Sequence, residues 1–239
     1  MTLTKLSPGS YGGGSPTVWR RDPVTMLVQG WRTENPGIDL PPDEDVATLP
    51  ILFAVDAVVP LDGGAMTLVD LMRMLRTFAT SAFRLEARQS YAAEKEDAAF
   101  AAWQERGCIP DAGDPLIADW TGMVRARVEG GAVMHRVHVV SDPMTEYVRF
   151  ELAMQRAYSV PVGEQVRVVD ADRHPDLARA EDFWLLDDRV GVRLIYDDGG
   201  RLIRLERMIT DEVDTARRVR DAAWAAGTDL AGIEAVALG

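Results

Sequence analysis

Residues Val133–Ala153 read VMHRVHVVSDPMTEYVRFELA, and this stretch decides the fold. Its first part, Val133–Val140, is an apolar run typical of a strand, and the Ser-Asp-Pro sequence at 141–143 marks a sharp stop before a helical pattern begins. The segment GEQVRVVD (Gly163–Asp170) then reads as a second strand. Because a strand, a helix and a strand follow one another, we predict a βαβ unit with two parallel strands.

Charge and composition restrict the partners and the location of the chain. Its 239 residues include 38 acidic and 26 basic side chains, and the resulting net charge of −12 would repel a phosphate backbone. We therefore expect no direct contact with nucleic acid. No apolar stretch approaches the length of a membrane span, so no membrane association is expected. The single cysteine, Cys108, excludes an internal disulfide and fits a reducing compartment, which predicts a cytoplasmic protein.

The pattern along the chain predicts three parts. Residues 1–16 are rich in glycine, serine and proline, which predicts a flexible N-terminus. Residues 17–60 contain the short β-type runs TVWRR, TMLVQGWRT and EDVATLPILF, and we predict a small β-rich extension there. Residues 61–239 are predicted to form an α/β domain, in which helices flank a mixed sheet.

The strands on both sides of the βαβ unit complete the predicted sheet. FRLEARQSY (Phe83–Tyr91) alternates apolar and charged residues, which places Arg84 and Glu86 on one face. After a loop, HPDLARAED, the runs FWLLD, VGVRLIYDD and RLIRLERMI predict an antiparallel meander, and a helix from about Asp211 closes the domain.

The residues that could bind a metal or do acid–base chemistry have simpler explanations. His135 and His138 lie three residues apart on a strand, so they point to opposite faces and cannot chelate one ion together. The pairs Asp187-Asp188 and Asp197-Asp198 could serve as paired carboxylates, but both stand where hairpin turns favour aspartate. We predict no metal site and no cofactor.

A ligand site is predicted where the parallel strands end, since ligands of open α/β sheets bind beyond the carboxyl ends of the strands. The helix that begins there would attract an anion, with Asp142 as its N-cap and Pro143 at its first position. On that helix Tyr147 and Glu151 share a face, although a tyrosine packed on the sheet and a solvated arginine would explain the pattern equally well. The candidate ligand-binding residues are Arg84, Glu86, Ser141, Asp142, Tyr147, Arg149 and Glu151.

Several segments together resemble a known family. SAFRLEARQSY, VHVVSDPMTEYVRFELA, GEQVRVVD, DFWLLDD and RDAAWAAG resemble an uncharacterised actinobacterial family of unknown function, over roughly Val69–Leu230. Members of that family are commonly encoded beside helix-turn-helix regulators of the WhiJ type. The N-terminal runs SPTVWRRDPVTMLVQGWRT and DLPPDEDVATLP resemble a separate small protein, which would make this chain a fusion.

The order of elements also resembles one half of a phospholipase D-type α/β domain. The signature of that family is H-x-K followed by an aspartate, and this chain has no lysine after Lys95. The resemblance therefore implies a catalytically inactive version of the fold.

From these observations we predict a non-catalytic regulatory or sensor protein that acts through a protein partner. A helix-turn-helix transcriptional regulator is the candidate partner, on the strength of the gene neighbourhood that the resemblance implies. A small-molecule or anion site is expected at the carboxyl-terminal edge of the parallel strands. The alternative is an enzyme or a biosynthetic accessory protein that acts on a small anionic metabolite.

Overall fold

The computed structural model describes residues 64–92 and 96–233, together with the backbone of short strands before them. The chain divides into two compact units, Met1–Leu61 and Asp62–Gly239. In the first unit β1 to β3 form an antiparallel sheet and β4 pairs with β5. These strands are β1 (Thr4–Lys5), β2 (Thr17–Arg20), β3 (Met26–Gln29), β4 (Trp31–Arg32) and β5 (Ala47–Thr48). Apart from β1, the predicted flexible segment 1–16 lies outside the described residues.

In the described part of the second unit, eight strands form one sheet in the order β13-β9-β8-β7-β10-β11-β12-β6. The strands are β6 (Ala65–Met66), β7 (Ser81–Glu86), β8 (Val133–Val140), β9 (Gln165–Asp170), β10 (Phe183–Leu186), β11 (Val190–Tyr196), β12 (Leu202–Arg207) and β13 (Thr228–Asp229). Strands β7, β8 and β9 are parallel, and the remaining pairs are antiparallel. The predicted mixed sheet and the predicted parallel βαβ unit are thus confirmed.

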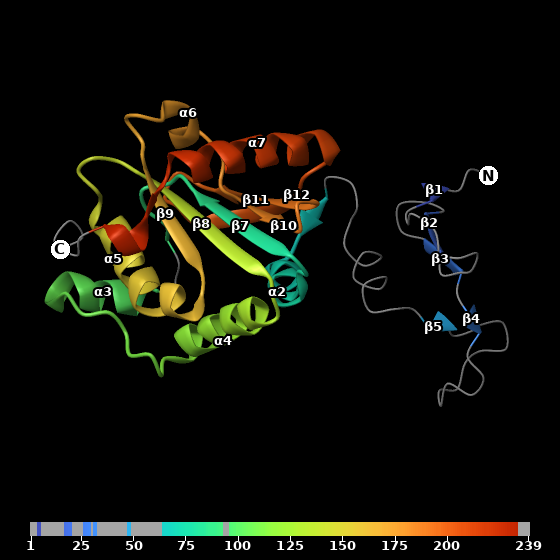
Figure 1. The fold of residues 1–239 in the computed structure, drawn as a ribbon, viewed down its shortest axis with the longest axis horizontal. Helices are drawn as coiled ribbons and strands as arrows, with labels where there is room; N and C mark the ends of the chain where they lie inside the picture. Colours follow the sequence, from blue (N-terminus) through green and yellow to red (C-terminus); the bar gives the residue numbers. More distant parts are fainter. Residues whose placement is uncertain are drawn as a thin grey trace. The chain divides into compact units, whose positions relative to one another are not determined.

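Helices cover both faces of this sheet (Figure 1). One face carries α6 (Pro175–Ala178), within the predicted HPDLARAED loop, and α7 (Thr210–Ala226). The other carries α2 (Leu68–Thr77), α3 (Asp97–Arg106), α4 (Pro115–Glu129) and α5 (Glu146–Met154). None of the described helices is both long enough and apolar enough to span a bilayer.

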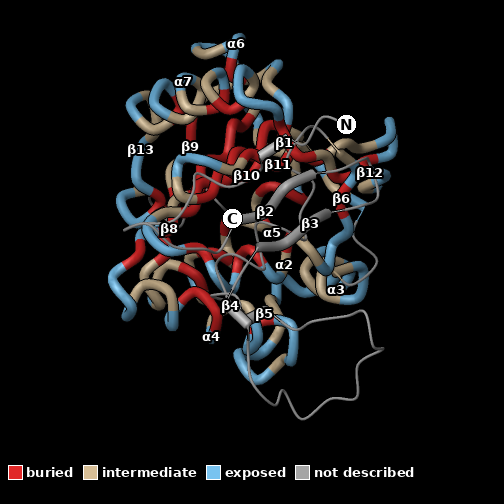
Figure 2. Tube along the Cα trace, turned by 90° about the vertical axis from the view of Figure 1, so that its right-hand side faces the viewer, coloured by how far each residue is buried: buried red, intermediate tan, exposed pale blue. Residues whose placement is uncertain are grey.

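The two faces of the sheet differ in chemistry. On the α7 side the strands contribute apolar side chains such as Phe83, Leu85 and Val137 to the core. On the opposite side β7 contributes Arg84 and Glu86, which confirms that these charges share a face. Their exposed fractions are only 3% and 6%, because helices cover that face as well, and most residues of the central strands are buried (Figure 2).

The predicted start of the crossover helix is wrong. Asp142 lies exposed in a turn, and the N-cap of α5 is Thr145, whose hydroxyl accepts a hydrogen bond from Val148 N at 3.2 Å. The same hydroxyl donates to Gln89 O at 2.6 Å, and Ser141 N donates to Gln89 Oε1 at 2.9 Å. These bonds hold the turn against the segment after β7, so the helix begins only beyond it.

The same helix changes its winding at its end. It continues as a π-helix, η1 (Gln155–Ser159), and a 3-10 turn, η2 (Val160–Val162). Gly163 then follows with a φ of 103°, and a Cβ there would lie 2.7 Å from a methyl carbon of Val128. Single π-turns inside helices are common at functional sites.

The Asp187-Asp188 pair is part of the hairpin turn between β10 and β11, as turn chemistry predicts. Both residues have positive φ, 51° and 55°. The Asp187 carboxylate accepts hydrogen bonds from the backbone N–H groups of Ala79, Thr80 and Ser81. It therefore ties this turn to the start of β7.

Replacing Asp187 with alanine is expected to lower the free energy of unfolding by about 1–2 kcal/mol at pH 7, since three N–H groups lose their acceptor. Burial alone would raise the pKa of Asp187, but the hydrogen bonds from Ala79, Thr80 and Ser81 lower it below its usual value. Its contribution is then complete above the unfolded pKa of about 3.9 and is lost as the pH falls through the folded value. Urea denaturation should show the gap between wild type and variant narrowing below about pH 4.

Asp187→Asn is the matched control, because asparagine tolerates positive φ and keeps one acceptor oxygen. It should lose less stability than the alanine variant. An alanine variant as stable as wild type at pH 7 would contradict the structural role of this carboxylate.

Candidate functional site

The register of the parallel strands brings four polar side chains together. Arg84 of β7 pairs with Arg136 of β8, and Glu86 pairs with His138. All four are on the face that α2 to α5 cover, and all are buried. Residues about fifty positions apart in the sequence therefore form one compact group in the middle of the sheet.

Glu86 is at the centre of this group. Its Oε2 accepts a hydrogen bond from Arg136 Nη1 at 2.8 Å and lies 3.0 Å from His138 Nε2, while Oε1 lies 3.3 Å from Arg84 Nε. Burial would raise the pKa of this carboxyl, but Arg136, followed by His138 and Arg84, holds it well below its usual range. Glu86 is therefore a buried carboxylate with a cationic group on both sides.

Each arginine has a second buried carboxylate. Arg136 Nε donates to Glu164 Oε1 at 2.7 Å, and Arg84 Nη2 donates to Asp182 Oδ2 at 3.0 Å. Asp182 also accepts a hydrogen bond from the Tyr91 hydroxyl at 2.5 Å. We call the residues of this network the buried polar cluster: Arg84, Glu86, Arg136, His138, Gln155, Glu164 and Asp182.

A second group of acids lies against the cluster. The Tyr147 hydroxyl donates to Glu96 Oε2 at 2.7 Å and lies 3.5 Å from Glu151 Oε1, so Tyr147 and Glu151 do share a face of the helix. Burial, followed by the charges of Glu96 and Glu86, raises the pKa of Glu151 well above its usual value. Burial, followed by Glu151 and Glu96, likewise raises the pKa of Tyr147. Acidic groups are crowded at this end of the site, and their raised pKa values favour the neutral, protonated forms.

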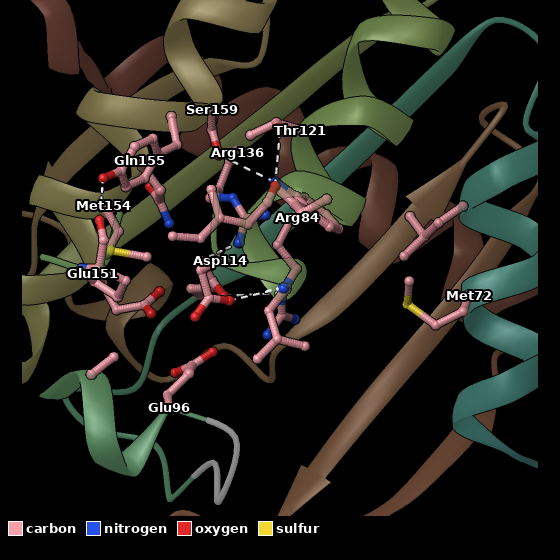
Figure 3. A pocket seen from close by; sticks show the side chains of 18 of the residues that line it. Met72, Arg84, Glu96, Asp114, Thr121, Arg136, Glu151, Met154, Gln155 and Ser159 are labelled. Carbon is pink, nitrogen blue, oxygen red and sulfur yellow. Dashed lines mark hydrogen bonds and ion pairs between the residues drawn. The ribbon is translucent and has the colours of Figure 1, made fainter. Parts of the chain in front are cut away.

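A pocket of about 370 Å³ opens onto the cluster (Figure 3). Its volume is in the range of small-molecule sites. Leu71, Met72 and Leu75 of α2 form an apolar wall, while Arg84 and the other charged groups reach it from the sheet and from α5. Arg84 Nη1 is buried and has no hydrogen-bond partner among the described residues, so it is an unsatisfied donor on a residue that lines the pocket.

Two tryptophans stand beside the charged side of the pocket. The Arg136 guanidinium lies 5.5 Å from the ring centroid of Trp120 and 5.6 Å from that of Trp184. Such cation–π contacts stabilise the arginine where little water is present. The pocket therefore combines an apolar wall, two aromatic rings and buried charges.

Carboxyl groups outnumber guanidinium groups at this site. The guanidinium groups are those of Arg84 and Arg136, and the carboxyl groups are those of Glu86, Glu96, Glu151, Glu164 and Asp182. The pKa values of Glu96 and Glu151 are raised, and a ligand that brings positive charge would favour the ionised forms of these two groups.

The structure brings only some of the predicted site residues together. Arg84, Glu86 and Glu151 line the pocket, and Tyr147 contacts Glu151. The other three do not line it: Ser141, Asp142 and Arg149. The Ser141 hydroxyl donates to Pro143 O at 3.1 Å, and Arg149 Nη1 donates to Met144 O at 2.7 Å. The group thus lies on a face of the sheet, whereas the sequence placed it at the strand ends.

Arg136 and Gln155 were not among the residues predicted from the sequence, and His138 was considered only as a partner of His135. Arg136 and His138 alternate with apolar residues in VMHRVHVV, in the same way as Arg84 and Glu86 alternate in β7. This shared alternation could have indicated that the polar residues of the two strands lie on the same face of the sheet. No comparable pattern points to Gln155, because its role depends on the π-helix that begins at this residue.

Fold and site together define an α/β domain with a buried polar cluster at the base of a pocket of small-molecule size. Residues 69–232 match the family described as "Domain of unknown function (DUF6879)", and the chain belongs to this family. The predicted resemblance to a family of unknown function is thereby confirmed. No curated protein matches the chain.

One similar solved structure is that of Nuc from Salmonella typhimurium, a phospholipase D family member. It is 12% identical to this chain, with a TM-score of 0.41, and the match covers 67% of this chain and 88% of Nuc.

Proposed function

We propose that this protein is a non-catalytic regulatory or sensor protein that binds a small molecule in the pocket and acts through a protein partner. The observation that supports this proposal is the pocket itself, in which an apolar wall faces buried charges with an unused donor at Arg84 Nη1. Buried charges of this kind stabilise the fold little, so a role in recognition would account for them.

The chemistry of the pocket favours a ligand with a cationic group on an apolar body. An ammonium group would pair with Glu96 and Glu151 and favour their ionised forms, and the body would lie against Met72 and its neighbours on α2. A purely anionic metabolite would gain from the arginines but would be repelled by the more numerous carboxylates.

Thermal unfolding with two compounds of the same shape tests this proposal. Phenethylamine is expected to raise the Tm of the wild-type protein, while 3-phenylpropionate should raise it less or not at all, because a ligand stabilises only the state that binds it. In Met72→Trp the indole should fill the pocket and abolish the rise. Val69→Trp, at a site on α2 that is 67% exposed, is the matched control and should behave as wild type.

Two results would contradict the proposal. One is a wild-type Tm that neither compound changes, and the other is a rise that Met72→Trp retains.

The proposed partner is a helix-turn-helix transcriptional regulator, and a pull-down of such a regulator by the full chain, with and without phenethylamine, tests that part separately. If no complex forms either with or without phenethylamine, the proposal of this partner is wrong.

A further inference from the structure

Three ligand atoms from three different elements converge at the base of the pocket. Glu86 at the end of β7, His138 of β8 and Glu151 of α5 each offer one such atom, and these atoms all lie within 4.8 Å of one another. A transition-metal ion bonds imidazole nitrogen and carboxylate oxygen at about 2.0–2.2 Å, so two atoms bound to one ion lie at most about 4.4 Å apart. Side-chain shifts of a few tenths of an ångström bring atoms within 4.8 Å of one another into this range. The spacing is therefore compatible with a single shared ion.

A fourth donor completes the group. Gln155 follows Glu151 by one helical turn, and its Oε1 lies 2.9 Å from His138 Nε2. Glu86 Oε2 lies 3.0 Å from the same nitrogen. One imidazole nitrogen carries at most one proton, and it cannot donate that proton well to two oxygens at once. A metal ion between these atoms could be bound by the nitrogen and by both oxygens at once.

The surroundings of Glu86 are those of an oriented ligand. Arg136 Nη1 donates to Glu86 Oε2, and Arg84 Nε lies 3.3 Å from Oε1, so two guanidinium groups hold the carboxylate in its orientation. Ligating carboxylates in proteins are usually held by such outer hydrogen bonds. The two guanidinium charges oppose a cation, but the carboxyl groups around them are more numerous, and a bound cation would favour the ionised forms of Glu96 and Glu151.

We propose that Glu86, His138 and Glu151 bind one divalent transition-metal ion, with Gln155 as a further oxygen ligand. The mixed imidazole and carboxylate set favours ions such as Zn²⁺ or Co²⁺ over Mg²⁺ and Ca²⁺, which prefer oxygen alone. His135 takes no part, because it lies on the opposite face and stacks on Trp224 with a centroid distance of 4.0 Å. This inference goes beyond the proposed function. The ion would compete with an ammonium group for Glu151, but the test of metal binding needs neither an organic ligand nor a partner.

Titration of the full chain with metal ions, after treatment with EDTA, tests the proposal. Calorimetry with Zn²⁺ should show one saturable site per chain, and bound Co²⁺ should give visible absorption bands of a site with nitrogen and oxygen ligands. His138→Gln is expected to abolish this site. Glu151→Gln should weaken Zn²⁺ binding by roughly 100-fold or more, beyond the ~10–100-fold cost of losing an outer hydrogen-bond partner.

His135→Gln is the matched control, since it removes the same residue type from the same strand but from the opposite face. It should bind Zn²⁺ and Co²⁺ as wild type does. Glu151→Gln keeps the shape of a side chain whose raised pKa favours the neutral form, so this variant is expected to fold and decides the question if His138→Gln does not fold. Circular dichroism and urea denaturation check both variants.

The proposal is overturned if the wild-type protein shows no saturable Zn²⁺ or Co²⁺ site. It is also overturned if folded Glu151→Gln binds Zn²⁺ as wild type does, or if His135→Gln loses binding to the same extent as His138→Gln. Because only metal ions are added, failure here leaves the thermal-shift result with phenethylamine unaffected, and the reverse also holds.

Discussion

Replacing Arg136 with methionine is expected to lower the free energy of unfolding by about 3–5 kcal/mol, because buried carboxylates lose their counter-ion. Arg136 Nη1 lies 2.8 Å from Glu86 Oε2, and its Nε lies 2.7 Å from Glu164 Oε1. Glu164 is 1% exposed, so water cannot replace the guanidinium. Urea denaturation of both proteins at pH 7 measures the loss.

Arg193→Met is the matched control for this prediction. Arg193 also contacts several carboxylates, including that of Glu212 at 2.8 Å, but its side chain is 20% exposed and lies nearer to solvent. We expect a loss of about 0–1 kcal/mol there. If Arg136→Met cost no more than Arg193→Met, the buried polar cluster would not be the strongly coupled network described above. Adding Glu86→Gln and Glu164→Gln to Arg136→Met should recover part of the stability.

Replacing Phe150 with alanine is expected to cost about 3–5 kcal/mol. Phe150 of α5 is 1% exposed, and its ring centroid lies 5.5 Å from that of Phe100 and 6.0 Å from that of Trp103. Both neighbours belong to α3, a helix in which no residue is fully buried. The loss of Phe150 should therefore create a cavity and also loosen α3.

Two measurements check the Phe150 prediction. Urea denaturation gives the global loss of stability. Relative to wild type, the variant should show amide hydrogen exchange that is accelerated more throughout Asp97–Arg106 than in α7. Phe150→Leu retains most of the volume and should cost clearly less. Unchanged exchange in α3 would show that other contacts attach this helix to the domain.

Local sequence patterns predicted the sheet well. The apolar runs of Val133–Val140 and Gly163–Asp170 sufficed for a parallel pair, because a helical pattern of the right length separates them. The antiparallel meander followed from its turn residues, which require particular backbone angles. In these places the local signal and the tertiary structure agree.

The buried polar cluster was only half predictable. Alternation in β7 placed Arg84 and Glu86 on one face, but nothing local states that β7 lies beside β8 or in which register. His135 and His138 do lie on opposite faces of the sheet, as predicted. The spacing of two residues along one strand gives no information about contacts with other strands. The partners of His138 come from β7 and η1, so spacing along the chain could not identify them.

The Asp142 prediction failed for a related reason. An aspartate followed by a proline is a strong local start signal for a helix, but Thr145 is hydrogen-bonded to Gln89, about fifty residues earlier. A long-range contact thus selected a later cap. Arg149 was judged from its helix alone, and its side chain folds back onto Met144 O.

The ion pairs of the buried polar cluster restrict which substitutions this sequence can accept. Arg84, Arg136, Glu164 and Asp182 come from separate segments of the chain, and each one satisfies a charge that another would leave unpaired. A change at one of these positions would be selected against until a second change restored the balance. Relatives should therefore replace them in concert, and the covariation of these positions across the family would trace the cluster from sequences alone.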